Sequence, residues 1–255
     1  MTLILVTIPC LQDNYTYLIH DPASGATAVV DVPDPDVIQA ELAARGWRLS
    51  DILITHHHPD HIDGVDPLRA ATGARVAGAA ADAHRLPRLD LALAGGDTLT
   101  VGTQTGHVID VSGHTIGHIA YHFPASGLLF TADSLMALGC GRLMEGSPAM
   151  MWDSLTKLAR LPDETLICSG HEYTANNAKF ALTIEPQNPE LILRCEAIAT
   201  ARAANQPTVP SLLSLERATN PFLRAHLPQV KSLMDMADSP DAEVFAEIRS
   251  RKDRF

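Results

Sequence analysis

The sequence predicts an α/β fold with sheets inside and helices outside, followed by a small all-helical domain. Two patterns support this fold class. In the first two-thirds of the 255 residues, short aliphatic and β-branched runs alternate with turns and helical segments, as in a sandwich of sheets and helices. From about residue 176 onward, helical segments separated by prolines follow one another without a convincing strand. We therefore expect an α/β domain over residues 1–171 and a helical domain over residues 172–255.

The expected strands are aliphatic or β-branched runs bounded by turn residues. They are Leu3–Ile8, Tyr15–His20, Thr27–Asp31, Ile52–Ile54, Val76–Gly78, His107–Val111, Ile119–Phe123, Leu128–Thr131 and Leu166–Cys168. The expected helices have apolar residues at helical spacing. They are Asp36–Arg45, Asp63–Ala71, Met151–Arg160, Ala178–Thr183, Pro189–Ala204, Leu227–Ala237 and Asp241–Arg251. The order of the strands within a sheet stays open.

The composition argues against several classes of partner. The formal net charge of −11 at pH 7 would repel the phosphates of a nucleic acid. No run of about 18 apolar residues could span a bilayer, and Leu3–Ile8 is too short, and lacks the basic leader, for a signal peptide. The cysteines Cys10, Cys140, Cys168 and Cys195 have no CxxC spacing, which favours free thiols in a reducing cytosol. We expect a cytoplasmic monomer that binds neither nucleic acid nor membrane.

The strongest functional signal is the segment Thr55–His61, which carries four histidines and an aspartate directly after a predicted strand. Imidazole nitrogen and carboxylate oxygen are ligands that zinc, iron and manganese accept. In an extended turn, His56 and His58 would point to one side while Asp60 and His61 point to another, so one loop could serve two ions. Because burying such groups unpaired is costly, the spacing predicts a metal site.

Two ions need ligands from elsewhere, because one ion takes three or four protein ligands. His114, Asp133 and His171 each follow a predicted strand, so one edge of the scaffold could present all three. A lone histidine after a strand is more often a polar or core residue. The HxHxDH spacing makes these residues candidate ligands.

Several separate segments resemble one family. The HxHxDH spacing at His56–His61 resembles the metallo-β-lactamase fold superfamily, and nearly the whole chain resembles glyoxalase II, the hydroxyacylglutathione hydrolases. The segments similar to that family's motifs are Gln12–Leu18 (DNYxYL), His114–His118 (HTxGH), Phe130–Ser134 with Gly139–Arg142 (FTGDTL…GCG[RK]), Gly170–Thr174 (GHEYT) and the basic end Arg249–Phe255 (R-x-x-KD-x-F). The metal motifs alone indicate the superfamily, whereas GCGR, GHEYT and the basic end indicate the family.

The resemblance implies an αββα sandwich of the metallo-β-lactamase type, with a catalytic domain over residues 1–171 and a substrate-binding helical domain over residues 172–255. It also implies two divalent metal ions, zinc first, with iron or manganese as alternatives. His56, His58 and His114 would bind one ion, Asp60, His61 and His171 the second, and Asp133 would bridge both. A hydroxide between the ions would be the nucleophile, with Asp60 and Asp133 as catalytic carboxylates. His57, His118 and Asp31 would support the ligands.

The implied substrate is the thioester S-D-lactoylglutathione, which is hydrolysed to D-lactate and glutathione in the second step of methylglyoxal detoxification. Glutathione carries two carboxylates, so an acidic protein needs local positive charge to hold it. The family's glutathione contacts correspond to Arg142, Tyr173, Asn177, Arg249 and Lys252. This implies that the basic C-terminal segment is a binding clamp rather than a solvated tail.

The chain departs from the family pattern at a few positions. Met144 stands where the family usually has Tyr or Phe, and a thioether cannot donate a hydrogen bond, so the glutathione contact there is expected to be weaker or reshaped. Pro59 replaces a bulkier residue within the metal loop, where we expect only local stiffening. Ala132 replaces the Gly often found before the bridging aspartate, and we expect no consequence.

The expected mechanism needs no protein nucleophile. The hydroxide would attack the thioester carbonyl, and the thiolate would leave with little acid assistance because a cysteine-like thiol has a pKa of ~8.5. Cys140 is an alternative nucleophile, but no partner base is evident. The alternative within the fold is a mononuclear iron persulfide dioxygenase, which lacks the basic end. A lactonase would not explain Arg249 and Lys252, and a structural metal module would need a closed coordination shell.

Overall fold

The computed structural model describes residues 2–255, which form two compact units that are described one at a time. The first unit contains the described residues up to Val111 and Ile116–Ala132. The second contains Ser112–Thr115 and Asp133–Phe255. The boundary expected near residue 171 rests on the sequence and stays a prediction.

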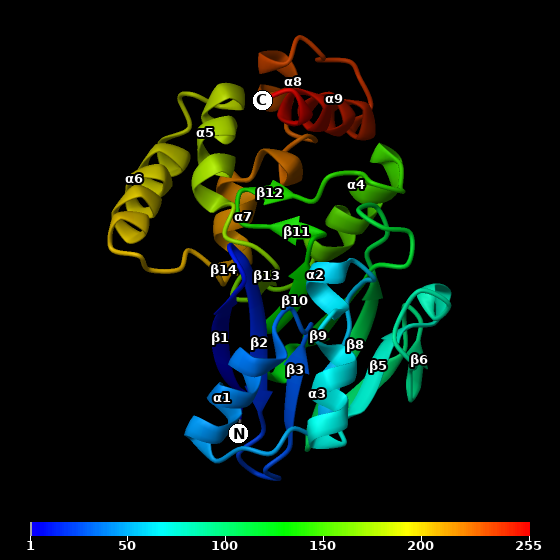
Figure 1. Ribbon diagram of the computed structural model, residues 1–255. Coiled ribbons are helices and arrows are strands. Elements are labelled where there is room, and N and C mark those ends of the chain that lie inside the picture. The colour runs from blue at the N-terminus through cyan, green and yellow to red at the C-terminus, as the bar shows by residue number, and fades with distance from the viewer. Residues whose placement is uncertain (1) are drawn as a thin grey trace. The chain divides into compact units, whose positions relative to one another are not determined.

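The first unit contains a six-stranded mixed sheet in which the strands follow chain order (Figure 1). Its strands are β1 (Ile4–Cys10), β2 (Asn14–His20), β3 (Thr27–Val30), β4 (Asp51–Leu53), β5 (Arg75–Ala79) and β6 (Leu91–Leu93). The pairs β1–β2 and β2–β3 are antiparallel, and the pairs from β3 to β6 are parallel. Parallel pairing brings the carboxyl ends of β3 and β4 to the same edge of the sheet.

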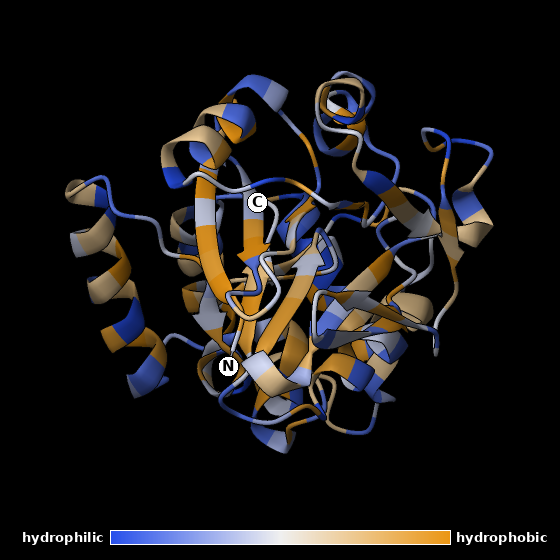
Figure 2. Cartoon of the chain, turned by 90° about the horizontal axis from the view of Figure 1, so that it is seen from below, coloured by the Kyte–Doolittle hydropathy of each residue, from blue (hydrophilic) through white to orange (hydrophobic). Residues whose placement is uncertain are grey.

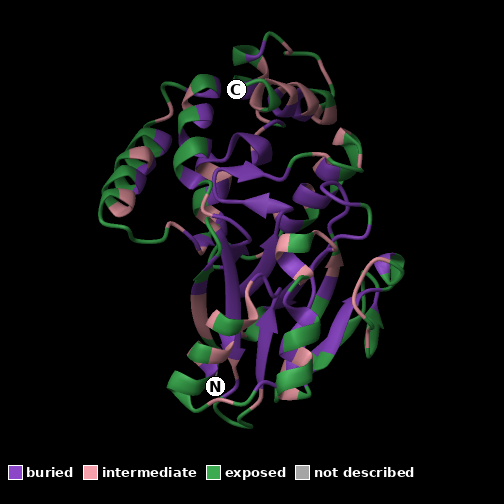
Figure 3. Ribbon diagram, viewed as in Figure 1, coloured by how far each residue is buried: buried purple, intermediate pink, exposed green. Residues whose placement is uncertain are grey.

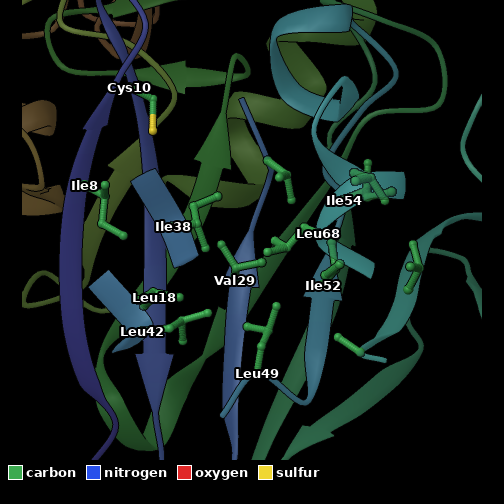
Figure 4. Packing of buried hydrophobic residues seen from close by; sticks show 14 residues of the cluster. Ile8, Cys10, Leu18, Val29, Ile38, Leu42, Leu49, Ile52, Ile54 and Leu68 are labelled. Carbon is green, nitrogen blue, oxygen red and sulfur yellow. The ribbon is translucent and has the colours of Figure 1, made fainter. Parts of the chain in front are cut away.

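Two helices cover one face of this sheet, α1 (Pro35–Arg45) and α3 (Val65–Thr72). Helix α1 begins where the Asp34 carboxylate accepts from two backbone amides of the first turn, and ends at Gly46 in the left-handed region. The apolar faces of both helices and the strands share one core cluster (Figure 4). Packing in this core keeps the ends of the strands rigid, including the end of β4, which the loop with the predicted metal ligands follows.

Four further strands of the first unit form an antiparallel meander. They are β7 (Thr98–Val101), β8 (Gln104–Asp110), β9 (Ile119–Phe123) and β10 (Leu128–Ala132). Every residue of β9 and β10 is buried. Hydrophobic residues, drawn orange in Figure 2, are concentrated in the strands inside the chain. The Tyr121 hydroxyl donates to the Ile54 carbonyl at 2.7 Å, which ties the meander to the residue that follows β4.

The second unit is mainly helical. Its helices are α4 (Pro148–Leu158), α5 (Thr174–Ile184), α6 (Pro189–Ala203), α7 (Leu213–Thr219), α8 (Pro228–Leu233) and α9 (Asp241–Asp253). It also holds the hairpin of β11 (Leu135–Met136) and β12 (Gly139–Cys140), and the pair β13 (Leu166–Ser169) and β14 (Ser211–Leu212). The helices keep exposed outer faces and buried inner ones (Figure 3). Within residues 2–255 no helix is long and apolar enough to cross a membrane.

The expectation of no strand beyond residue 176 is wrong, because β14 pairs with two residues of β13. A two-residue strand has no periodicity, so its pairing depends on partners distant in the chain. The metal loop is also less extended than expected. Pro59 occupies the first turn of the short helix α2 (Pro59–Ile62), where its missing N–H costs nothing, so Asp60 and His61 lie in a helical turn.

Candidate metal centre

The loop after β4 turns two imidazole nitrogens toward one point. His56 Nε2 lies 3.1 Å from His58 Nδ1. The Thr55 hydroxyl donates to Asp31 Oδ2 at 2.7 Å and lies 3.0 Å from His56 Nδ1, so it accepts the Nδ1 proton and leaves the lone pair of His56 on Nε2. Two ligands of one tetrahedral zinc ion lie roughly 3.4 Å apart. The spacing of these nitrogens therefore suits a shared ion.

Asp31 fixes the orientation of the metal loop. Its carboxylate accepts from the Thr55 amide at 2.8 Å and from His61 Nδ1 at 2.8 Å, and all three residues are buried. Because His61 donates through Nδ1, its Nε2 lone pair faces away from Asp31, toward Asp60 Oδ2 at 3.7 Å. Such a carboxylate holds a histidine in the tautomer that a metal requires. Asp31 itself has a φ of +59°, which is uncommon for a non-glycine residue.

Asn14 holds the other potential ligand of this loop. Its side-chain amide donates to Asp60 Oδ2 at 2.9 Å, so one carboxylate oxygen is fixed in place although the Asp60 side chain is 40% exposed. The sequence motif DNYxYL included Asn14, but no role was predicted for it. Asn14 lies 46 residues before Asp60 in the chain, so nothing in the sequence indicates this contact.

In the second unit, the Asp133 carboxylate lies between two histidines. Asp133 Oδ2 lies 3.5 Å from His114 Nε2 and 3.3 Å from His171 Nε2, and all three residues are buried. His114 Nδ1 donates to the Arg142 carbonyl at 2.6 Å, so its Nε2 carries a lone pair toward Asp133. Nitrogen lone pairs facing a carboxylate oxygen repel each other unless a cation lies among them. The donor set therefore fits a divalent metal ion.

The structure thus brings the predicted ligands together in two groups. His56, His58, Asp60 and His61 gather in the first unit, and His114, Asp133 and His171 in the second. The predicted supporting residues also lie in the first unit. His57 Nδ1 faces Asp82 at 3.2 Å, and the His118 ring stacks on His56 with centroids 4.6 Å apart.

A pocket of about 380 Å³ lies in the second unit beside Asp133. The lining combines the two predicted ligands His114 and Asp133 with all five predicted substrate contacts, Arg142, Tyr173, Asn177, Arg249 and Lys252. This volume is in the range of small-molecule sites. The Tyr173 ring also stacks on His171, with centroids 4.7 Å apart.

The cations of this pocket differ in how they are held. Arg249 is buried, and its guanidinium donates to the Cys140 carbonyl at 3.0 Å and to Asp253 at 2.9 Å. The Arg142 side chain is exposed and lies 3.5 Å from the same Asp253 oxygen. Lys252 Nζ lies over the Phe255 ring. Burial, and next to it the charge of Arg249, lowers the pKa of Lys252 to about 8.

Two buried thiols of the second unit, Cys140 in the pocket wall and Cys168 in β13, are poor nucleophiles. Burial raises the pKa of Cys140 to about 11, despite the opposing effect of Arg249, and burial also raises the pKa of Cys168 strongly. Since the thiolate is the reactive form, neither thiol is activated. The raised pKa values of these thiols therefore argue against a covalent thiol mechanism.

Two family models together match nearly the whole chain. The model of the metallo-β-lactamase superfamily matches residues 12–171, and the model of the hydroxyacylglutathione hydrolase C-terminus matches residues 172–255. A hydroxyacylglutathione hydrolase of Cereibacter sphaeroides is 66% identical over 100% of both chains. Another, from a Jannaschia species, is 65% identical over 98% of both chains. The likeness therefore includes both the metal loop and the basic C-terminal end.

Solved structures show the same fold at lower identity. The structure of ETHE1 from Myxococcus xanthus is 24% identical, with a TM-score of 0.66 over 98% of both chains. The BLEG-1 B3 metallo-β-lactamase is 21% identical, with a TM-score of 0.67 over 86% of this chain and 99% of that chain. Together with the family models, these likenesses confirm the predicted α/β sandwich with a C-terminal helical region.

Proposed function

We propose, on the premise that the chain belongs to the hydroxyacylglutathione hydrolase family of the metallo-β-lactamase superfamily, that it hydrolyses S-D-lactoylglutathione to D-lactate and glutathione. The observation that carries this substrate is the pocket in which the predicted glutathione contacts surround Asp133. A persulfide dioxygenase is the weaker alternative, since the full-length relatives at 65–66% identity are named hydroxyacylglutathione hydrolase.

The ligand groups support two divalent ions, which we assign as zinc with iron or manganese as alternatives. His56, His58 and His114 would hold one ion, Asp60, His61 and His171 the other, and Asp133 both. Such ions, when bound, lower the pKa of a water and stabilise charge on a carbonyl oxygen. Asp133 supports this assignment because one of its oxygens faces two imidazole nitrogens.

The protein's own contribution is to fix these groups before substrate arrives. Asp31 keeps the His61 proton on Nδ1, and Asn14 holds one oxygen of Asp60. The carbonyl of Arg142 keeps the His114 proton on Nδ1. A residue of the substrate pocket is thereby hydrogen-bonded to a proposed metal ligand. Preorganisation of this kind lowers the reorganisation needed during the reaction. No side chain has to protonate the departing sulfur, because a thiol of this kind has a pKa of ~8.5.

The pocket cations would hold the two carboxylates of the glutathione part. Arg142 can offer a guanidinium fork to one carboxylate, and Lys252 lines the same pocket. Met144 is 59% exposed, where its thioether cannot donate a hydrogen bond. We further propose that the enzyme is a cytoplasmic monomer acting in methylglyoxal degradation, with neither a membrane nor a nucleic acid as partner.

The lowered pKa of Lys252 predicts that substrate affinity falls above pH 8. Below the pKa of about 8 the ammonium attracts the substrate carboxylates, and above it that charge is lost. We expect the KM for S-D-lactoylglutathione to rise by up to about tenfold between pH 7 and 9.5, equivalent to one charge-assisted hydrogen bond. Steady-state kinetics of wild type and Lys252→Arg would check this.

The Lys252→Arg variant keeps its charge throughout this range, so its KM should follow only the ionisation of the substrate. Equal pH dependence of the two proteins would contradict a role for the Lys252 charge.

The proposed reaction is tested by two parallel assays on the metal-loaded protein. Loss of S-D-lactoylglutathione, followed by ultraviolet absorbance, is expected at an enzymatic rate, with D-lactate and glutathione formed in equal amounts. Oxygen consumption with glutathione persulfide is expected to be absent. Oxygen uptake without thioester cleavage would establish the dioxygenase instead.

A further inference from the structure

The β11–β12 hairpin forms one wall of the substrate pocket. Met136 and Cys140 belong to the hairpin, and Gly141 and Arg142 follow it directly; all four line the pocket. Gly141 donates its N–H back to the Ser134 carbonyl at 3.1 Å. The position of the hairpin therefore sets the positions of several groups that face the substrate.

The residue at the turn of the hairpin, Leu138, has a backbone conformation that it would not favour by itself. Leu138 has a φ of +54°, a region that residues with a Cβ rarely adopt. Its N–H donates to Glu216 Oε2 at 2.8 Å. Its side chain is fully buried in an apolar cluster with Ala178 and Ala181 of α5 and Leu191 of α6. Packing and one buried carboxylate thus impose the turn.

Glu216 is the centre of this support. It is 0% exposed, and besides Leu138 it accepts from Ser211 Oγ at 2.7 Å, from Asn220 Nδ2 at 3.1 Å and from the Arg194 guanidinium. Charge-assisted hydrogen bonds between a buried carboxylate and a buried guanidinium fix the geometry of both groups. Ser211 and Asn220 flank α7, the helix that carries Glu216, whereas Arg194 comes from α6 and Leu138 from the hairpin turn.

The carbonyl groups of the hairpin are held in the same way. Asn220 Nδ2 donates to Met136 O at 3.1 Å and Gly139 O at 3.0 Å, and Asn177 Nδ2 donates to Ala137 O at 3.1 Å. Side chains from helical segments therefore fix both strands of the hairpin. Loss of the Asn220 contacts would let the hairpin move without removing any of the described residues that line the pocket.

We propose that Glu216, with Arg194 and Asn220, is a positioning group that sets the affinity for the glutathione part of the substrate by holding the β11–β12 hairpin. Glu216 and Arg194 are not among the described residues that line the pocket, so the effect passes through the hairpin to Cys140 and Arg142. The inference rests on the proposed function, because it presumes a glutathione thioester in the pocket.

The test compares two lactoyl thioesters on the metal-loaded protein, one of glutathione and one of N-acetylcysteamine, which has the same thioester but no carboxylates. In Glu216→Gln we expect the KM for the glutathione thioester to rise roughly tenfold, since a small misplacement of binding groups has effects of this order. Its kcat should be nearly unchanged, and kcat/KM for the short thioester should equal that of wild type. Metal content should also equal wild type.

Glu185→Gln is the matched control, because Glu185 is likewise buried and forms a bidentate pair with Arg224, at 2.6 and 2.9 Å, and neither of them is among the described residues that line the pocket. It should lower stability and leave both KM values unchanged. If Glu216→Gln does not fold, Asn220→Ser removes the donors to the two hairpin carbonyls while keeping the Arg194–Glu216 pair, and the same KM effect is expected.

Three results would overturn the proposal: equal losses on both thioesters, no change on either, or a KM rise of the same size in Glu185→Gln. A wild-type protein that does not cleave the glutathione thioester would refute the proposed function itself and is seen before any variant is made.

Discussion

Replacement of Asp133 by alanine is expected to reduce thioester hydrolysis by at least roughly a thousandfold, because the ions supply most of the rate enhancement in such a site. One Asp133 oxygen faces both His114 and His171, so its loss removes a ligand that both proposed ions share. Metal content, measured on the purified variant by elemental analysis, is expected to fall together with activity.

Asp235→Asn is a suitable control, because Asp235 is an exposed carboxylate in the same unit. It should keep wild-type metal content and turnover. An Asp133→Ala variant that retained two ions and full activity would show that this carboxylate does not bridge the ions.

Replacement of Gly141 by alanine is expected to have the second largest effect. A Cβ at this position would lie 1.9 Å from the Asp133 carbonyl oxygen and 3.0 Å from His114 Nδ1. The Asp133 backbone cannot move aside as the end of a flexible side chain can, so the main chain at Asp133 or at residue 141 must shift, next to the His114 ring. We expect kcat/KM to fall by about a hundredfold and the free energy of unfolding to fall by about 2 kcal/mol, measured by kinetics and by denaturant unfolding.

Gly25→Ala is the control that distinguishes the steric clash at residue 141 from the backbone strain of replacing any glycine. Gly25 has a φ of +78° and open space around its Cα, so alanine there costs only about 1 kcal/mol of backbone strain and should leave kcat/KM unchanged. Wild-type kinetics for Gly141→Ala would mean that the close approach to Asp133 is not needed for activity.

Much of the fold could be predicted from the sequence where hydrophobic runs have sharp boundaries. The strand Ile119–Phe123 has the predicted bounds, since Pro124 ends a run rich in β-branched and aromatic residues. Strand β7, with the sequence Thr-Leu-Thr-Val, alternates between exposed and buried residues, but a run of only four residues between two glycine-containing turns is too short to stand out in the sequence. Helix α4 begins earlier than predicted, since Ser147 caps it and Pro148 opens it.

The sequence singles out the candidate ligands because histidines and aspartates are crowded together there and follow predicted strands. The residues that hold them were found less well, because their contacts join segments far apart in the chain. Asn14 reaches Asp60 across 46 residues, and Glu216 reaches Leu138 across 78. A buried glutamate within a helix looks like any polar residue until the donors around it are known. The residue spacing within one motif therefore predicts candidate metal ligands, but not the distant residues whose hydrogen bonds hold such groups in place.

The central claim is that two ions, held by these histidines and aspartates, activate water for thioester hydrolysis. Titration of metal-free protein with zinc, with bound ions and S-D-lactoylglutathione hydrolysis measured on the same samples, tests it most directly. We predict that two ions bind per chain and that activity rises from background as they bind. Metal-free protein that hydrolysed the thioester at the full rate would contradict the claim.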